Sequence, residues 1–276
     1  MKKNIALLLG LVLGFGFVSC SSDDDDDESV NGEGKYLAEE LITRYDWKDG
    51  KRSDEGKLYN RYEYNEKEQL VFRDLGIMGY KMTYTYNADG EMTENRLYSN
   101  DNFLKLYKFE YGNSSSVTYV YNPENRLVTT VKNEYNPDGK IAKHTEIIDS
   151  ISPNYGTVFT YTYSGNTETI EITNLRNGSF ERKITKEYDS HGNETKYTVT
   201  NANGRISTGE SVNEYDSNGR LLKKTGPIYD DGTPYGYTEY TYNADGTVKK
   251  EHCVTRMGTY SEEEYDLEHT YKYKKK

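Results

Sequence analysis

Hydrophobic and polar residues alternate along most of the chain after residue 57. The segment 180–188 is typical, because every second residue from Phe180 to Tyr188 is aromatic, aliphatic or basic. The residues between them are Glu, Lys and Thr. Successive side chains of a strand point to opposite faces, so this pattern predicts strands with one aromatic face and one polar face. A one-sided pattern of this kind is typical of an antiparallel sheet.

The alternation is organised by a repeat. The stretch Tyr84-Thr85-Tyr86-Asn87-Ala88-Asp89-Gly90 returns letter for letter at residues 240–246. Weaker copies lie between them at a spacing of roughly two dozen residues, which indicates a repeat architecture. The strand-end tyrosines that mark the copies are Tyr64, Tyr86, Tyr111, Tyr135, Tyr163, Tyr188, Tyr215, Tyr242 and Tyr273.

Each copy predicts a strand end followed by a tight turn. Asn, Asp and Gly after the tyrosine supply the positive-φ positions that reverse a chain. The copy at residues 66–68, Glu-Lys-Glu, is degraded and lacks the glycine. A second turn lies in the middle of each unit, for example at Arg176-Asn177-Gly178, Asn203-Gly204 and Asp230-Asp231-Gly232. Two strands a unit predict an up-and-down meander of about 16–18 antiparallel strands.

The motif Tyr215-Asp216-Ser217-Asn218-Gly219-Arg220-Leu221 resembles the YD-type repeat of Rhs-like proteins. The resemblance extends over about residues 57–273. The chain is also similar to uncharacterised Bacteroidota surface lipoproteins that are assigned a porin-like barrel. That resemblance implies a closed β-barrel at the cell surface.

Closure of the meander is expected on physical grounds as well, because a long meander has two edges that can pair with other chains. The polar face of Thr, Glu and Lys does not fit lipid, which requires an apolar band. We therefore expect a water-soluble, porin-like barrel with the tyrosines facing its interior. An open twisted or rolled sheet is the alternative.

The N-terminal residues predict where in the cell the protein is located. Residues 1–19 have a basic start and a short apolar core, which is typical of a signal peptide. The ending Phe17-Val18-Ser19-Cys20 resembles a lipoprotein signal, cut before Cys20 and acylated on its thiol. Residues 20–35 form an acidic tether, and acids directly after the lipid cysteine resemble the surface-export signal of Bacteroidota lipoproteins. The expected location is the outer membrane, with the domain facing the cell exterior.

Residues 36–276 are expected to form one β domain. The alternation over residues 41–45 favours an entry strand, and one helical turn at Leu37 and Leu41 is the alternative. The formal net charge of the chain is −11, and its one strongly basic stretch is 274–276. Nucleic acid is therefore excluded as the main partner, because phosphate binding requires clustered Lys and Arg. No transmembrane segment is expected after cleavage. Trp47, the single tryptophan, is expected to cap one end of the sheet, and stacking on a carbohydrate is the less favoured alternative.

Residues that carry catalytic chemistry are not indicated. Cys253 lies beside His252 but within a repeat strand, which favours a packed residue over a nucleophile. The histidines lack zinc-ligand spacing, and His191 occupies a turn position that other units fill with Asn or Asp. No calcium-loop sequence accompanies the Asn-x-Asp-Gly turns. We therefore expect no metal, no cofactor and no enzymatic activity.

The leading hypothesis is a surface binding module for a glycan or an envelope protein. Its candidate ligand-binding residues are inward-facing tyrosines, namely Tyr86, Tyr188, Tyr215, Tyr240 and Tyr242. The alternatives are a passive structural shell and, less favoured, a glycan hydrolase. Asp149-Ser150-Ile151 resembles the O-glycosylation acceptor of Bacteroidota exported proteins.

Overall fold

The computed structural model describes residues 35–228, 234–257 and 261–275. These residues form nineteen strands and one short 3-10 helix, η1 (Gly76–Met78). Residues 1–34, which contain the expected signal peptide and most of the tether, and the expected turn at residues 230–232 lie outside the described part. The first nine strands are β1 (Lys35–Lys48), β2 (Lys51–Arg52), β3 (Lys57–Tyr64), β4 (Leu70–Leu75), β5 (Tyr80–Tyr86), β6 (Met92–Ser99), β7 (Asn102–Tyr111), β8 (Ser115–Tyr121) and β9 (Leu127–Tyr135).

The second half of the chain continues the same meander. Its strands are β10 (Ile141–Ile147), β11 (Gly156–Ser164), β12 (Thr167–Asn174), β13 (Phe180–Tyr188), β14 (Glu194–Asn201), β15 (Ile206–Tyr215), β16 (Leu221–Ile228), β17 (Gly236–Tyr242), β18 (Val248–Met257) and β19 (Ser261–Lys275). The expected first strand is confirmed as β1.

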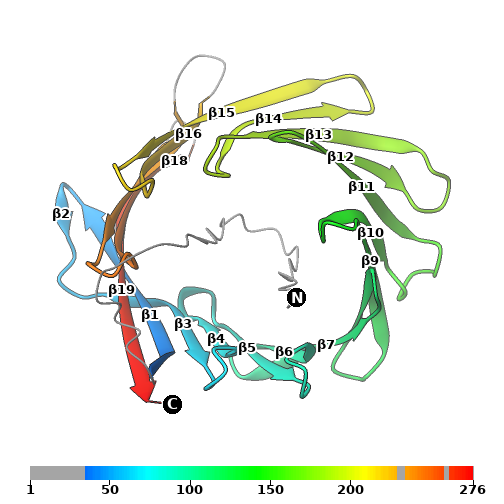
Figure 1. Cartoon of the computed structure of the whole chain (residues 1–276), viewed down its shortest axis with the longest axis horizontal. Coiled ribbons are helices and arrows are strands. Elements are labelled where there is room, and N and C mark those ends of the chain that lie inside the picture. Colours follow the sequence, from blue (N-terminus) through cyan, green and yellow to red (C-terminus); the bar gives the residue numbers. More distant parts are fainter. Residues whose placement is uncertain (1–34, 229–233, 258–260, 276) are drawn as a thin grey trace.

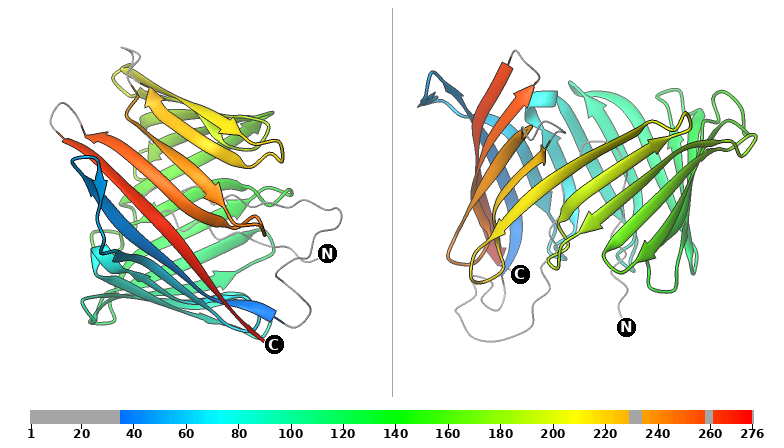
Figure 2. Two further views of the ribbon diagram at one scale, coloured as in Figure 1. Left: turned by 90° about the vertical axis from the view of Figure 1, so that its left-hand side faces the viewer. Right: turned by 90° about the horizontal axis from the view of Figure 1, so that it is seen from above.

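The sheet closes into a barrel (Figure 1). From β3 to β19, each strand pairs antiparallel with the next strand along the chain, and β1 pairs with β19 on one side and with β3 on the other. The two-residue strand β2 pairs with the end of β1 and adds no strand to the ring, so the barrel has eighteen strands. The predicted meander and its closure are confirmed, and the alternative of an open sheet is wrong. Figure 2 shows the strands inclined across the barrel wall.

The two series of turns lie at opposite rims of the barrel. Every strand that ends in an expected marker tyrosine is odd-numbered and runs toward one end, which we call the tyrosine rim. The mid-unit turns and the β1–β2 hairpin form the opposite rim. β1 starts and β19 ends at the tyrosine rim, where Lys35 pairs with Lys275. The repeat therefore corresponds to one up-strand and one down-strand of the barrel.

One hydrogen-bond pattern builds four turns of the tyrosine rim, those after Tyr64, Tyr86, Tyr188 and Tyr215. In the turn after Tyr86, the Asn87 side-chain oxygen accepts the backbone N–H of Glu91 at 2.9 Å, and the Gly90 N–H donates to the Asn87 carbonyl. The degraded copy folds in the same way, because Asn65 accepts the N–H of Gln69 and Glu68 adopts a φ of +60°. The Asn or Asp that follows the tyrosine thus fixes the turn through its side chain.

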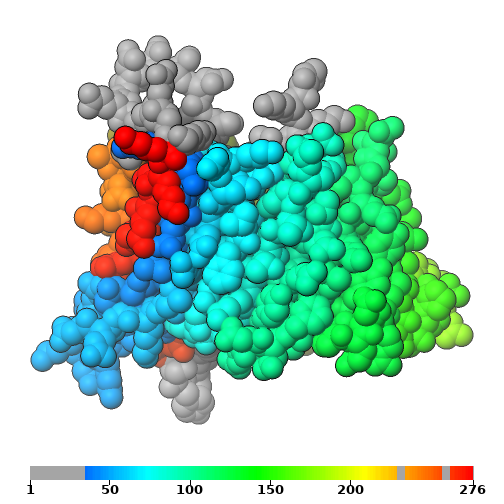
Figure 3. All heavy atoms as spheres, turned by 90° about the horizontal axis from the view of Figure 1, so that it is seen from below, coloured from blue at the N-terminus to red at the C-terminus, as the bar shows by residue number. Residues whose placement is uncertain are grey.

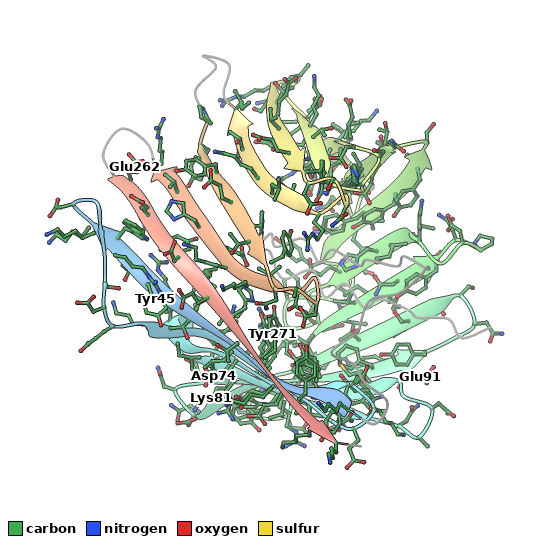
Figure 4. The ribbon with its side chains drawn as sticks, turned by 60° about the vertical axis from the view of Figure 1, so that its left-hand side comes forward. Tyr45, Asp74, Lys81, Glu91, Glu262 and Tyr271 are labelled. Carbon is green, nitrogen blue, oxygen red and sulfur yellow. The ribbon has the colours of Figure 1, made fainter. Side chains whose placement is uncertain are left out.

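The outer face of the wall is identified by β2. Figure 1 shows β2 outside the ring, and Arg52 of β2 lies 3.8 Å over the ring of Tyr45 in β1. Tyr45 therefore points outward, as Figure 4 shows, and its even-numbered neighbours Glu40, Ile42 and Arg44 point inward. Directly opposed residues of neighbouring strands share a face, so the register extends this assignment around the barrel.

The outer face is polar, as the alternation predicts. Cross-strand ion pairs cover it, for example Lys223–Glu239 at 2.7 Å and Lys196–Glu210 at 2.8 Å. Figure 3 shows the outer surface of β3 to β9 as one continuous wall. The buried apolar cluster lies on the inner face and consists of Leu97, Tyr107, Phe109 and Val120. The core is thus one layer of side chains on the inside of the wall and not the interior of a sandwich. Within the described residues, we find no helix of the length and apolar character that a membrane span requires.

Candidate functional site

The inner face of the barrel carries the predicted tyrosines. Tyr240 lies opposite Glu251, which lies opposite Leu267, and Leu267 shares its face with Tyr271. Tyr271 lies opposite the inward residue Glu40. The same reasoning through the register places Tyr86, Tyr188 and Tyr215 inward. These residues belong to β5, β13, β15 and β17, so they line the barrel at separate places and do not gather into one pocket.

Four inward tyrosines near the tyrosine rim connect one repeat unit to the unit before it. The hydroxyl of Tyr86 donates to the carbonyl of Leu70 at 2.7 Å, and that of Tyr163 donates to the carbonyl of Ile141 at 3.0 Å. In each case the acceptor is the first residue after the preceding turn. Tyr242 and Tyr271 repeat this bond to Leu221 and Val248. Four units are thus joined by one hydrogen bond that recurs with the repeat.

At two other units the tyrosine bonds to an acid. Tyr188 donates to Glu168 at 3.0 Å, and Tyr215 donates to Asp189 at 2.5 Å. Asn193 donates to the Tyr215 hydroxyl at 2.7 Å, and the His191 ring stacks on Tyr215 with centroids 4.0 Å apart. Burial and the bond to Asp189 raise the pKa of Tyr215 to about 12. The backbone N–H of His191 donates to Asp189, which confirms His191 as a turn residue.

The densest inward cluster lies at the seam where β19 meets β1. His269 is bonded on both ring nitrogens, by Nδ1 to Glu40 at 3.0 Å and by Nε2 to Glu251 at 3.0 Å. The His269 side chain is 6% exposed. Burial alone lowers the pKa of an imidazole, but hydrogen bonds to the two carboxylates outweigh it and raise the pKa of His269 to about 9. The cluster is therefore a carboxylate–imidazolium–carboxylate bridge that joins β1, β19 and β18.

The strand position of Cys253 separates it from His252. Cys253 points inward and is 6% exposed, whereas His252 points outward, where its Nδ1 is bonded to Asp266 at 2.8 Å. Burial raises the pKa of the Cys253 thiol to about 11. The thiol is thus a packed residue, as the strand pattern predicts, and the adjacent histidine cannot activate it.

The outer side of the seam holds a second polar cluster, centred on Asp266, which is 1% exposed. Lys250 and Arg52 each lie 3.4 Å from Asp266 Oδ2. The Trp47 ring packs edge-on against His252, with centroids 5.8 Å apart. Trp47 therefore closes the seam at the opposite rim. This cluster could not be predicted from the sequence, because its members come from three separate segments of the chain.

A third inward group surrounds Arg73. Arg73 lies opposite Tyr62 in β3 and Met82 in β5, and its guanidinium is 5.3 Å from the Tyr62 ring centroid. Tyr64 and Tyr84 occupy the diagonal positions on the same face. Burial raises the pKa of Tyr84 to about 12 and also raises the pKa of Tyr62 and of Tyr64. Sequence reasoning missed this group, because Arg73 lies in a degraded copy of the repeat.

A metal is not indicated in the part of the chain that the structure describes, where no group of three or more His, Cys, Asp or Glu side chains is arranged so that it could hold a metal ion. His144 is held instead by Asn133, with 2.8 Å between His144 Nδ1 and the Asn133 oxygen, and burial lowers its pKa. The inner face therefore offers aromatic rings, amides and isolated charges, which are groups that bind organic ligands.

The comparisons with known proteins concern the fold. No protein-family model and no curated protein matches the sequence. Among solved structures, the chain is similar to a porin-like protein from Bacteroides uniformis, with 12% identity and a TM-score of 0.46 over 86% of this chain and 98% of that chain. It is also similar to a porin-like protein from Bacteroides vulgatus, with 11% identity and a TM-score of 0.42 over 84% and 98% of the two chains. The resemblance to YD-type repeats stays a prediction.

Proposed function

We propose that this protein is a lipid-anchored binding module of the cell surface and that its barrel interior binds a glycan. The observation that carries the proposal is the sidedness of the wall, which has aromatic rings inside and ion pairs outside. A barrel of eighteen strands is wider than its side chains can fill, so ligand-sized space inside it is expected. Tyrosine rings on a rigid sheet suit the apolar faces of sugars, and neighbouring amides suit their hydroxyls.

The place where the barrel begins supports an orientation for the anchor. Lys35 lies at the tyrosine rim, so a tether from Cys20 reaches the barrel from that side. An extended tether of this length spans on the order of 50 Å, because each residue adds at most about 3.3–3.6 Å. The tyrosine rim then faces the membrane, and the opposite rim faces outward.

The opposite rim has the character of an accessible surface. Among the described residues, eight of the ten exposed large apolar side chains lie on it, including Ile77, Met78, Ile151 and Ile206. The Ser150 side chain of the expected O-glycosylation acceptor is also exposed there. The anchor is tested by palmitate labelling in cells, where the wild type should take up the label and Cys20→Ser should not. Protease treatment of intact cells then tests whether the domain faces outward.

Glycan binding is tested by calorimetric titration of the full chain against a panel of neutral and acidic oligosaccharides. Replacement of the inward ring by Tyr240→Leu should weaken binding, and the matched change Tyr119→Leu on the outer face should leave it unchanged. Tyr119 points outward, because it neighbours the inward residue Val120, and its hydroxyl donates to the exposed Glu110 at 3.3 Å. A panel without any binder, together with empty pull-downs from cell envelopes, would refute the proposal.

A passive structural shell is the second candidate. It is favoured by the recurring bond of the rim tyrosines, because hydroxyls that join repeat units are unavailable to a ligand. A shell without a ligand predicts that deletion of one central unit, residues 189–215, leaves a folded protein with unchanged envelope properties. Loss of folding on that deletion would indicate a barrel with a fixed strand number. A hydrolase is disfavoured at the seam, because the His269 ring fills the space between Glu40 and Glu251.

A further inference from the structure

Arg73 differs from the other arginines of the described chain in its surroundings. Within the described residues, it is the one arginine that is at least partly buried and has no carboxylate within 4.0 Å. Arg44, Arg52 and Arg61 each have two acidic partners at 2.6–3.6 Å. The remaining arginines without an ion pair in this part are exposed to solvent.

The guanidinium also has unused donor capacity. The Nε–H of Arg73 is buried and has no hydrogen-bond partner among the described residues. Arg52 and Arg61 share this feature, but carboxylates hold both of their guanidinium groups. A buried donor without a partner carries a desolvation cost, so such groups usually have a role. The register shows that Arg73 points inward. Glu40 points inward and lies opposite Tyr62, and Tyr62 in turn lies opposite Arg73, so all three side chains share the inner face.

The groups around Arg73 define the chemistry of a ligand. Tyr62, Tyr64 and Tyr84 lie beside the guanidinium, and all three bring hydroxyl groups with rings that are largely buried. Asn95 lies opposite Tyr84 in β6 and is 4% exposed. A guanidinium prefers a carboxylate or a sulfate, because its planar fork matches two oxygens of the anion. Phenol rings and an amide beside it suit the ring and the hydroxyls of a sugar.

We infer that Arg73 binds the anionic group of an acidic saccharide, a uronate carboxylate or a sulfate ester, inside the barrel. The inference rests on the proposed function and gives it a substrate class. In the complex, the Arg73 guanidinium contacts the anion, and the rings of Tyr62 and Tyr84 contact the sugar ring. The inward acids Glu40 and Glu251 do not compete for Arg73, because both are held by His269.

The test uses calorimetric titration of the full chain with three probes: oligogalacturonate, the same oligomer as its methyl ester, and a sulfated galactan oligosaccharide. The ester keeps the sugar chain and removes the charge. At least one anionic probe should bind tenfold or more tightly than the ester, and the difference should shrink with added salt. Arg73→Gln should reduce the anionic affinity to that of the ester, whereas Arg73→Lys should retain part of it because it keeps the charge and loses the fork.

Arg182 provides the matched control. It also points inward, opposite Ile172 in β12, and it is exposed and has no ion pair in the described chain. Arg182→Gln removes the same charge from another part of the wall and should leave the affinity unchanged. Thermal melts of all variants check that they are folded.

The outcomes separate the two proposals. Equal binding of ester and anionic probes, or equal losses with Arg73→Gln and Arg182→Gln, would overturn the inference and leave glycan binding intact. Binding of the ester without binding of either anionic probe would also overturn the inference and leave glycan binding intact. Failure of every saccharide in the panel would overturn the proposed function itself and the inference with it.

Discussion

The bridge around His269 gives the sharpest prediction, because its stabilising effect depends on pH with a defined sign. In the folded chain the pKa of His269 is about 9, whereas an unperturbed histidine has 6.5. A raised pKa means that the folded state binds the proton more tightly. The stabilisation is therefore complete below pH 6.5 and is lost as the pH rises through 9.

The size of the effect follows from this pair of values. At 1.36 kcal/mol for each tenfold change in proton affinity, the bridge contributes about 3 kcal/mol at pH 6, about 2 kcal/mol at pH 7.5 and well under 1 kcal/mol at pH 9. The His269 side chain is 6% exposed, so little of this is lost to solvent screening. His269→Gln removes the cation and leaves Glu40 and Glu251 facing each other across the seam, which is strongly destabilising for buried charges.

The assay is urea unfolding of the wild type, His269→Gln and a control at several pH values from 6 to 9. The wild type should lose about 3 kcal/mol of unfolding free energy across this range, and the loss should be absent in His269→Gln. The triple change Glu40→Gln, Glu251→Gln and His269→Gln should recover part of the stability that the single change loses, because it removes the uncompensated charges. The range ends at pH 9 because tyrosines ionise above it.

His144→Gln is the control, since His144 is also an inward histidine but is held neutral. Burial lowers its pKa, so its effect has the opposite sign and falls below pH 6.5, where the unfolded chain takes up a proton and the folded chain resists it. The variant should keep the wild-type slope between pH 7 and 9. The reasoning would be refuted by a wild type whose stability is flat from pH 6 to 9, or by an equal slope in His269→Gln.

Four further predictions concern the turns, the unit-to-unit bonds and the pairing of β10 with β11, and urea unfolding at pH 7 checks them together. Tyr163→Phe should cost about 1 kcal/mol, because the Ile141 carbonyl loses its partner, and a change under 0.3 kcal/mol would contradict the role of this bond. Glu68→Gly should stabilise the fold by roughly 1 kcal/mol, because Glu68 has a φ of +60°, which glycine adopts without strain. Gly139→Ala should destabilise the fold by roughly 1 kcal/mol, because Gly139 has a φ of +85°. The space around Gly139 is open, so this cost comes from the backbone and not from a clash. Gly156→Ala should prevent folding or shift β11, since its Cβ would lie 1.9 Å from the Glu146 carbonyl oxygen, and an unchanged midpoint would contradict the observed register.

The turn chemistry shows how far local sequence reaches. The glycine of the copy at Tyr86 predicts a reversal, and the structure has it. The copy at Tyr64 lacks the glycine, yet Glu68 takes the same left-handed conformation because Asn65 and the pairing of β3 with β4 enforce it. The backbone preference of a single residue is weak, and a neighbouring side-chain hydrogen bond and strand pairing override it here.

The sequence alone determined the features that recur at short intervals along the chain. Alternation at every second residue placed the tyrosines on one face, and the recurring Tyr-Asn/Asp-x-x-Gly motif marked the strand ends that became one rim. The closed meander also followed from the number of strands and the need to satisfy their edges.

Only the tertiary structure decided which residues meet across the wall. His269 bonds Glu40 from 229 positions away, and Asp266 is enclosed by residues from two other segments of the chain. Arg73 became a candidate because no acid came near it among the described residues, and its own copy of the repeat carried no sign of this. Register and closure set these contacts, because a shift of one residue would turn every inward side chain outward, and no local pattern encodes the partner of a distant strand.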